Sequence, residues 1–315
     1  MGLFDIFKKK NAEPQITWET TIKTSENYDP WAKTSGTRND NYAIAAFIRI
    51  SVGGAKVGTT NDAYARYFNY EFHVYDPIKY HKRVISDGYL VDASPNIALK
   101  KLKLAELKVI LSNAGFSDKG RKDDLIARIM DNIDISSLNL EKYYVPSEKG
   151  LEHLKQFEYV FQLKNYGISW EEFDVSKEVY PTLKPNDIIW RILTKRFNEE
   201  NTDGNFGLAR NALFNMAKLL EHEGKCIDAL CFYTLVLYYD TSGCGNKQIE
   251  KLDEIELAPG VIECIHRLKD NYDEQIITRC YDRYRLPYHY INKVNFKKLL
   301  FDIFDDKSID IKNYI

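Results

Sequence analysis

The clearest alternation of apolar and polar residues in the chain lies between Leu99 and Ile133. Apolar residues recur there at steps of three and four in two groups: Leu104, Leu107, Leu111 and Ala114, then Leu125, Ile126 and Ile129. This spacing predicts two short helices, each with one apolar face. The first helix should end near Gly115 in a left-handed cap, with Phe116 folding back as the accompanying hydrophobic contact. We therefore expect a helical hairpin in this segment.

The rest of the chain gives broader patterns. The apolar run from Tyr42 to Val52 fits either a helix or a strand, and residues 143–157 suggest a short extended segment that enters a helix. Pro181 and Pro185 mark a boundary, after which the pattern becomes helical. These patterns predict a mainly α, multi-domain fold with an α+β N-terminal module, a helix-loop-helix hairpin and a C-terminal α-helical domain.

Composition limits the partners of the chain. Its 315 residues are 44% hydrophobic and 29% charged, enough for two or three soluble globular domains. The net charge is −2, so any binding to nucleic acid must come from a local basic patch. Five cysteines without C-x-x-C spacing favour a reducing, cytoplasmic compartment. The longest apolar run, Ala229 to Tyr239, is too short for stable membrane insertion.

The hairpin segment LKLAELKVILSNAGFSDKGRKDDLIARI resembles the SAP domain, a small helix-loop-helix module that binds DNA. The matching positions are Leu104, Glu106, Leu107, Lys108, Leu111, Gly115, Gly120, Lys122, Leu125, Ile126 and Arg128. In two respects the segment departs from the family. Lys103 stands where the family often has a Ser or Thr cap, and the eight basic residues of 99–133 face five acidic ones, a net charge of only +3.

The resemblance implies a duplex-DNA interface that contacts the phosphate backbone. We expect Lys119, Arg121 and Lys122 to neutralise phosphates, with backbone N–H groups around Gly120 and the start of the second helix as further donors. The predicted DNA-binding residues are Lys103, Lys108, Lys119, Gly120, Arg121, Lys122 and Arg128. Little sequence discrimination is expected beyond a preference for A·T-rich DNA.

Two further resemblances concern the flanking segments. Ala209 to Asp240 is similar to one tetratricopeptide repeat, with Gly224 at the turn between its helices, which implies a protein-interaction surface. The lead-in from Tyr80 to Leu90 resembles segments that precede SAP-like modules in bacterial and phage proteins. It implies a bacterial or phage origin without specifying an activity.

Two N-terminal features have alternative interpretations. The first ten residues, MGLFDIFKKK, could lie on a membrane or act as a frayed terminus with a local anchor, and we favour the second. Between Tyr64 and Tyr89, aromatic and basic residues alternate closely enough to stack and neutralise a nucleic acid. Tyrosine-rich cores are common, so we favour a structural core there.

The predicted divisions are a flexible N-terminal segment (1–14), an aromatic-rich module (15–98), the SAP-like hairpin (99–134), a connector with a possible strand–helix element (135–180) and a helical interaction domain (181–315). We predict a non-enzymatic DNA-binding adaptor without cofactor or metal, nucleoid-associated if it binds DNA, whose C-terminal domain holds a protein partner. His222 and Cys226 share a helix face, but buried cysteines explain them better than zinc. The alternative is a structural protein whose hairpin does not bind DNA, and an enzyme without a visible motif is a third hypothesis.

Overall fold

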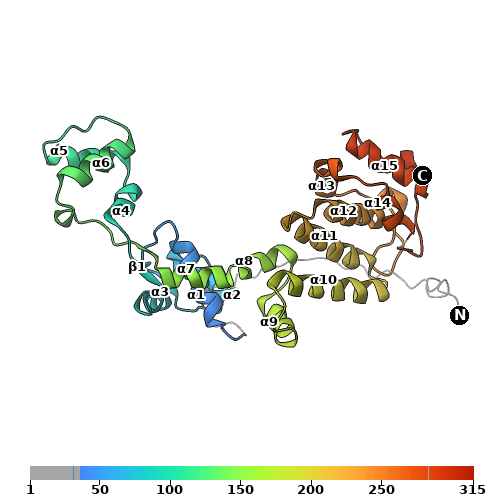
Figure 1. Cartoon of the computed structure of the whole chain (residues 1–315), viewed down its shortest axis with the longest axis horizontal. Helices are drawn as coiled ribbons and strands as arrows, with labels where there is room; N and C mark the ends of the chain where they lie inside the picture. The colour runs from blue at the N-terminus through green and yellow to red at the C-terminus, as the bar shows by residue number, and fades with distance from the viewer. Residues whose placement is uncertain (1–30, 32–35, 283) are drawn as a thin grey trace, which may run out of the picture. The chain divides into compact units, whose positions relative to one another are not determined.

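The computed structural model describes residue 31, residues 36–282 and residues 284–315. The described chain is mainly helical, with a single two-stranded sheet among these residues (Figure 1). It divides into two compact units, one ending at Val160, here the N-terminal unit, and one spanning Phe161–Ile315, here the C-terminal unit. The mainly α, multi-domain prediction is confirmed. The predicted segment 1–14 lies outside the described residues.

The N-terminal unit is built around α1 (Asp40–Ser51), so the ambiguous apolar run is a helix. The Asn39 side chain accepts a hydrogen bond from the Asn41 N–H and caps the helix, and Asp40 lies in the first turn, where negative charge is favoured. Seven consecutive residues, 42–48, are buried, so α1 is enclosed on all sides. It packs against α3 (Pro77–Ser86) and α7 (Glu148–Phe157).

Several aromatic residues of this unit form its core, whereas Tyr70 is exposed. The rings of Phe47 and Phe68 lie 4.4 Å apart, and Tyr64 and Tyr80 also pack on Phe47. A short helix, α2 (Tyr67–Tyr70), contributes Phe68. His81 is fully buried, with its Nδ1 2.9 Å from the Tyr64 hydroxyl, and burial lowers the pKa of His81 to about 4. These rings are occupied in packing, as expected for a structural core, and are not available to stack bases.

The hairpin segment is inserted between the two strands of the sheet. β1 (Leu90–Asp92) pairs antiparallel with β2 (Tyr144–Pro146), with Asp92 opposite Tyr144. The segment 93–143 therefore starts and ends at neighbouring positions of the sheet, and the ion pair between Lys56 and Glu141 ties it to the residues before it. β2 and α7, which the sequence analysis placed in a connector, belong to this unit. Gly150 of α7 packs closely on the residue before β1, because a Cβ there would lie 2.2 Å from the Tyr89 carbonyl oxygen.

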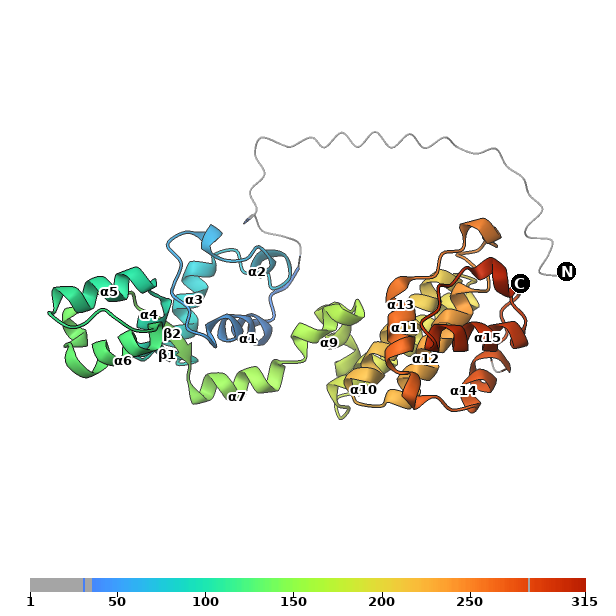
Figure 2. The same ribbon diagram turned by 90° about the horizontal axis from the view of Figure 1, so that it is seen from above.

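The inserted segment contains three helices, α4 (Pro95–Lys101), α5 (Leu104–Asn113) and α6 (Lys122–Asn132). α5 and α6 lie side by side in both views of the ribbon (Figure 1, Figure 2). Their apolar faces enclose a core of six buried residues, Leu99, Leu107, Leu111, Leu125, Ile126 and Ile129. Five of the six come from the apolar groups that predict the two helices.

The C-terminal unit is a stack of helices. α10 (Pro185–Thr202), α11 (Phe206–His222) and α12 (Cys226–Asp240) pack in sequence order. α11 and α12 form a hairpin whose turn contains Gly224 at φ +74°, and the small residues Ala217 and Ala229 are fully buried in it. The remaining α-helices of the unit are α8 (Val160–Leu163), α9 (Trp170–Val179), α13 (Pro259–Arg267), α14 (Gln275–Ile277) and α15 (Lys293–Phe304). The likeness of this hairpin to a tetratricopeptide repeat stays a prediction.

Candidate nucleic-acid interface

A basic residue precedes each helix of the inserted hairpin, and an acid of the first turn caps each helix. At α5, the Glu106 carboxylate accepts a hydrogen bond of 2.5 Å from the backbone N–H of Lys103. At α6, the Asp124 carboxylate accepts one of 2.8 Å from the N–H of Arg121. These acids replace the missing Ser or Thr cap and occupy donors at the positive ends of the helix dipoles. The Arg121 N–H, which the sequence analysis offered to a phosphate, is therefore already satisfied.

The loop between the helices starts with the expected glycine cap. Gly115 has φ +77°, and the N–H of Phe116 donates to the Leu111 carbonyl at 2.8 Å, the long hydrogen bond of this cap. The Phe116 side chain nevertheless stays 37% exposed, so its hydrophobic contact is only partial. Gly120 has φ +132°, and a Cβ there would lie 3.2 Å from Asp124 atoms. The loop therefore favours glycine at this position.

Arg128 holds the loop in place from inside the hairpin. Its Nη1 donates hydrogen bonds to the carbonyl oxygens of Ser117, at 2.5 Å, and Lys119, at 3.0 Å. A guanidinium presents several donors in a fixed plane, so one side chain can bridge two carbonyls of a loop. The Arg128 side chain therefore positions the backbone of Lys119, and it is itself half-buried.

Lys122 connects the start of α6 to the end of α4. Its Nζ donates a hydrogen bond of 2.7 Å to the backbone carbonyl of Lys100, at the C-terminal end of α4. A cation is favoured there because the last carbonyls of a helix carry partial negative charge. This contact brings the start of α6 beside the α4–α5 junction. Lys100 and Lys101 thereby join the predicted residues Lys103, Arg121 and Lys122 on one edge of the hairpin.

The predicted site residues thus fall into two groups. Lys103, Lys119 and Arg121 are exposed, and no carboxylate of the described chain lies within ion-pair distance of their side chains. Lys122 and Arg128 make hydrogen bonds inside the hairpin, and Lys108 is half-buried on α5. The sequence analysis did not select Lys100 and Lys101. Pro95 could have indicated a short helix that ends at these two lysines and so places them beside the hairpin.

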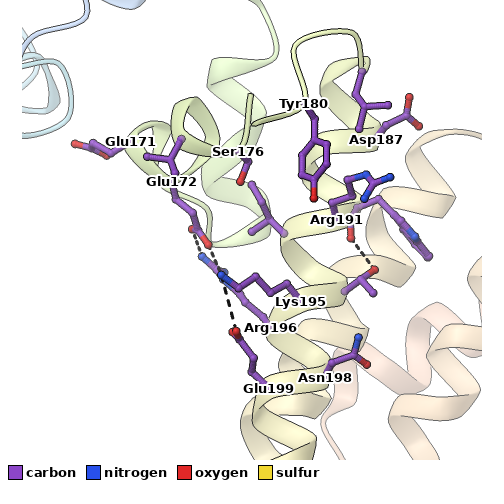
Figure 3. A pocket seen from close by; sticks show the side chains of 15 residues that line it. Glu171, Glu172, Ser176, Tyr180, Asp187, Arg191, Lys195, Arg196, Asn198 and Glu199 are labelled. Carbon is purple, nitrogen blue, oxygen red and sulfur yellow. Dashed lines mark hydrogen bonds and ion pairs between the residues drawn. The ribbon is translucent and has the colours of Figure 1, made fainter. Parts of the chain in front are cut away.

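A second candidate surface lies in the C-terminal unit. A groove of about 1180 Å³ runs between α9 and α10, lined by residues of both helices and the turn between them. In Figure 3, Glu172 and Arg196 point toward each other across the groove, where the Arg196 Nε lies 3.2 Å from a Glu172 carboxylate oxygen. The Tyr180 ring and the Arg191 guanidinium stack at 4.4 Å. Apolar side chains line the groove beside the charged ones, and among them Val175 is 64% exposed.

Two absences in the described part of the chain concern membrane spans and metal sites. No helix there is long and apolar enough to cross a membrane. No group of three or more His, Cys, Asp or Glu residues in that part is arranged to hold a metal ion. The expectation that His222 and Cys226 share a helix face is wrong: His222 ends α11 and Cys226 begins α12, because the turn at Gly224 lies between them, and no such group surrounds them.

Comparison with known proteins identifies the inserted hairpin. No curated protein and no solved structure matches the chain. One family does match, over residues 98–134, and it covers all three helices apart from the first residues of α4. That match agrees with the helical hairpin, its glycine cap and its basic edge, and it suggests nucleic-acid binding in general. Residues 98–134 are a SAP domain.

Proposed function

We propose that the protein is a non-enzymatic DNA-binding adaptor whose SAP domain makes weak contacts with the phosphate backbone of duplex DNA. The observation that carries this proposal is the basic edge at which the α4–α5 junction meets the start of α6. Lys103, Lys119 and Arg121 present exposed charges there, while Lys122 and Arg128 fix the backbone that carries them. A phosphate backbone is recognised by such positioned cations without base contacts.

The expected binding is modest and depends strongly on salt. About three to five neutralised phosphates give a slope of log affinity against log salt of about −3 to −4.5. The acids at the helix starts compete for the same donors, because Glu106 and Asp124 already cap α5 and α6. Contacts with phosphates carry no base information, so we expect affinity to vary little with sequence, with at most a preference for A·T-rich DNA.

The adaptor part of the proposal rests on the C-terminal unit. The groove between α9 and α10 combines exposed apolar surface with charged residues at its edges, as protein-binding grooves do. We infer that this unit holds a protein partner while the SAP domain touches DNA, in a cytoplasmic, nucleoid-associated setting. The alternative, a structural role in which the hairpin binds another chain, is favoured by the acidic residues beside its loop, Asp118, Asp123 and Asp124.

The test is a salt series of duplex-DNA binding by fluorescence anisotropy. The variant is K119Q/R121Q, which removes two exposed charges and leaves the hydrogen bonds of Lys122 and Arg128 intact. The matched control is K79Q/K82Q on α3, which removes the same charge outside the SAP domain. We expect the slope of the first variant to become shallower by about 1.8 and that of the control to equal the wild-type slope.

Two outcomes would contradict the proposal. The wild-type protein could show no binding to duplex DNA at low salt, or both variants could lose the same affinity. Equal losses would mean that only net charge matters and that the SAP domain does not form the interface. Either result would leave the structural alternative as the better explanation.

A further inference from the structure

Two cysteines that are far apart in sequence meet in the C-terminal unit. The Sγ atoms of Cys231 and Cys280 lie 4.0 Å apart, although 49 positions separate the residues. Cys231 belongs to α12, which packs against the π-helical segment Thr278–Asp282 that contains Cys280. The other three cysteines are Cys226, Cys244 and Cys264, and none of them is in contact with another thiol within the described chain.

The surroundings give the two thiols different roles. Cys280 is 1% exposed and lies 3.3 Å from the Cys231 carbonyl oxygen, whereas Cys231 is partly exposed. Arg279 lies next to this pair and approaches Asp228 of α12 at 3.9 Å. The hydrogen bond with Cys280 and the positive charge of Arg279 lower the pKa of Cys231 against the opposing effect of burial. The pKa of Cys280 is raised by the same contact and by burial.

We propose that Cys231 and Cys280 are an oxidative modification site that closes into a reversible disulfide in response to hydroperoxides. Thiolates are the nucleophiles of this chemistry, and a partly exposed thiolate beside an arginine is the reactive type. The partner sulfur is already in place to resolve the first product. Disulfides of reducing compartments are usually transient in this way.

The steps balance with the hydroperoxide as the oxidant. The Cys231 thiolate attacks one peroxide oxygen, the O–O bond breaks, and the leaving oxygen takes a proton to give an alcohol or water. Cys231 is then a sulfenic acid. The Cys280 sulfur attacks the Cys231 sulfur, the S–O bond breaks, and the departing hydroxide takes the Cys280 proton and leaves as water. Two molecules of a low-molecular-weight thiol reverse the modification by two successive thiol–disulfide exchanges, through a mixed disulfide, and leave joined as a disulfide.

The geometry requires only a local adjustment. The two sulfurs must approach from 4.0 Å to about 2.05 Å, the length of a disulfide. Cys280 lies in a five-residue π-helix, an irregular and short element of a kind that often occurs at functional sites. The disulfide would link this segment covalently to α12 and close a loop of chain that contains α13. The oxidised C-terminal unit should therefore open less readily around residues 278–282.

The test uses the full-length protein and hydrogen peroxide as the probe. After a peroxide titration, free thiols are alkylated and the protein is digested without reduction for mass spectrometry. We expect a linked peptide pair containing Cys231 and Cys280, lost on treatment with a thiol reductant, to appear at lower peroxide than any oxidation of Cys226. C226S, on the same helix, should retain the linked pair and C231S should lose it.

A second variant separates the two steps. In C280S the sulfenic acid of Cys231 cannot be resolved, so it should accumulate and react with a dimedone probe. The proposal is overturned if wild-type Cys231 is alkylated equally with and without peroxide. It is also overturned if the linked peptides join other cysteines, or if protein unfolded in urea forms the same pair with equal preference. The wild-type mapping needs no variant, so a poorly folding C280S would not weaken the test.

Discussion

Arg128 is a predicted DNA-binding residue, but its contacts in the structure are with the loop between α5 and α6. Its Nη1 donates to two loop carbonyls, those of Ser117 and Lys119. A hydrogen bond from a charged donor contributes about 1.5–3 kcal/mol, and we take about 0.5–1.5 kcal/mol for each here, because water can replace part of it at a half-exposed side chain. Replacing Arg128 with Gln should therefore destabilise the loop by about 1–3 kcal/mol.

Hydrogen exchange measures this loss directly. Amide exchange of Phe116 and Arg121, whose N–H groups bond to Leu111 and Asp124 at the two ends of the loop, should become roughly 5- to 150-fold faster in R128Q. R128K is the matched control for charge, because lysine keeps the cation without the planar fork. If Arg128 positions the loop, R128K should also exchange faster and bind DNA more weakly.

The refuting result is specific. If R128K exchanges and binds DNA like the wild type while R128Q loses affinity with an unchanged loop, then Arg128 contacts a phosphate and does not brace the loop.

The other predictions concern the core of each part of the N-terminal unit. Leu111→Ala should destabilise the SAP domain by about 2–5 kcal/mol, because the side chain is fully buried, and hydrogen exchange should rise in α5 and α6 but not in α11 and α12. Gly150→Ala should destabilise the packing of α7, since the new Cβ would meet the Tyr89 carbonyl at 2.2 Å, and a normal thermal midpoint in this variant would contradict the close approach. Burial lowers the pKa of His81 in the folded protein to about 4, so His81 binds a proton more readily in the unfolded chain. Its contribution to the free energy of unfolding is therefore complete above pH 6.5 and falls by up to about 3 kcal/mol as the pH drops toward 4. Urea titrations across this range should show the loss in the wild type and not in H81L.

The sequence allowed the SAP domain to be predicted because every signal for it is local. The apolar spacing, Gly115 and Gly120 each determine one helix face or one loop conformation. The structure buries five of the predicted apolar residues and places both glycines in the loop, whereas Leu104 and Ala114 stay exposed. The two in-helix caps were less visible, because Glu106 and Asp124 look like charges that dilute a basic patch until their hydrogen bonds are known. The hydrogen bonds of Lys122 and Arg128 are tertiary contacts, which residue spacing in the sequence does not reveal.

Long-range features could not be found in the sequence for a similar reason. β1 and β2 are three residues each, too short for a period of two to be recognised, and they pair across about fifty residues. Cys231 and Cys280 lack any local motif, because helix packing alone brings them together. The apolar run of α1 was ambiguous because a helix buried on all sides shows no polar face.

Because the SAP domain is inserted between two paired strands, it can be deleted or replaced as one segment. Its two ends leave the N-terminal unit side by side: Asp92 pairs with Tyr144, and the Ala93 N–H donates to the Tyr143 carbonyl at 2.9 Å. A tight turn can join such ends without moving either strand, as domain insertions in other folds require. The inserted segment can thus be exchanged for another with similar end spacing, with the paired strands and the aromatic core around α1 left in place.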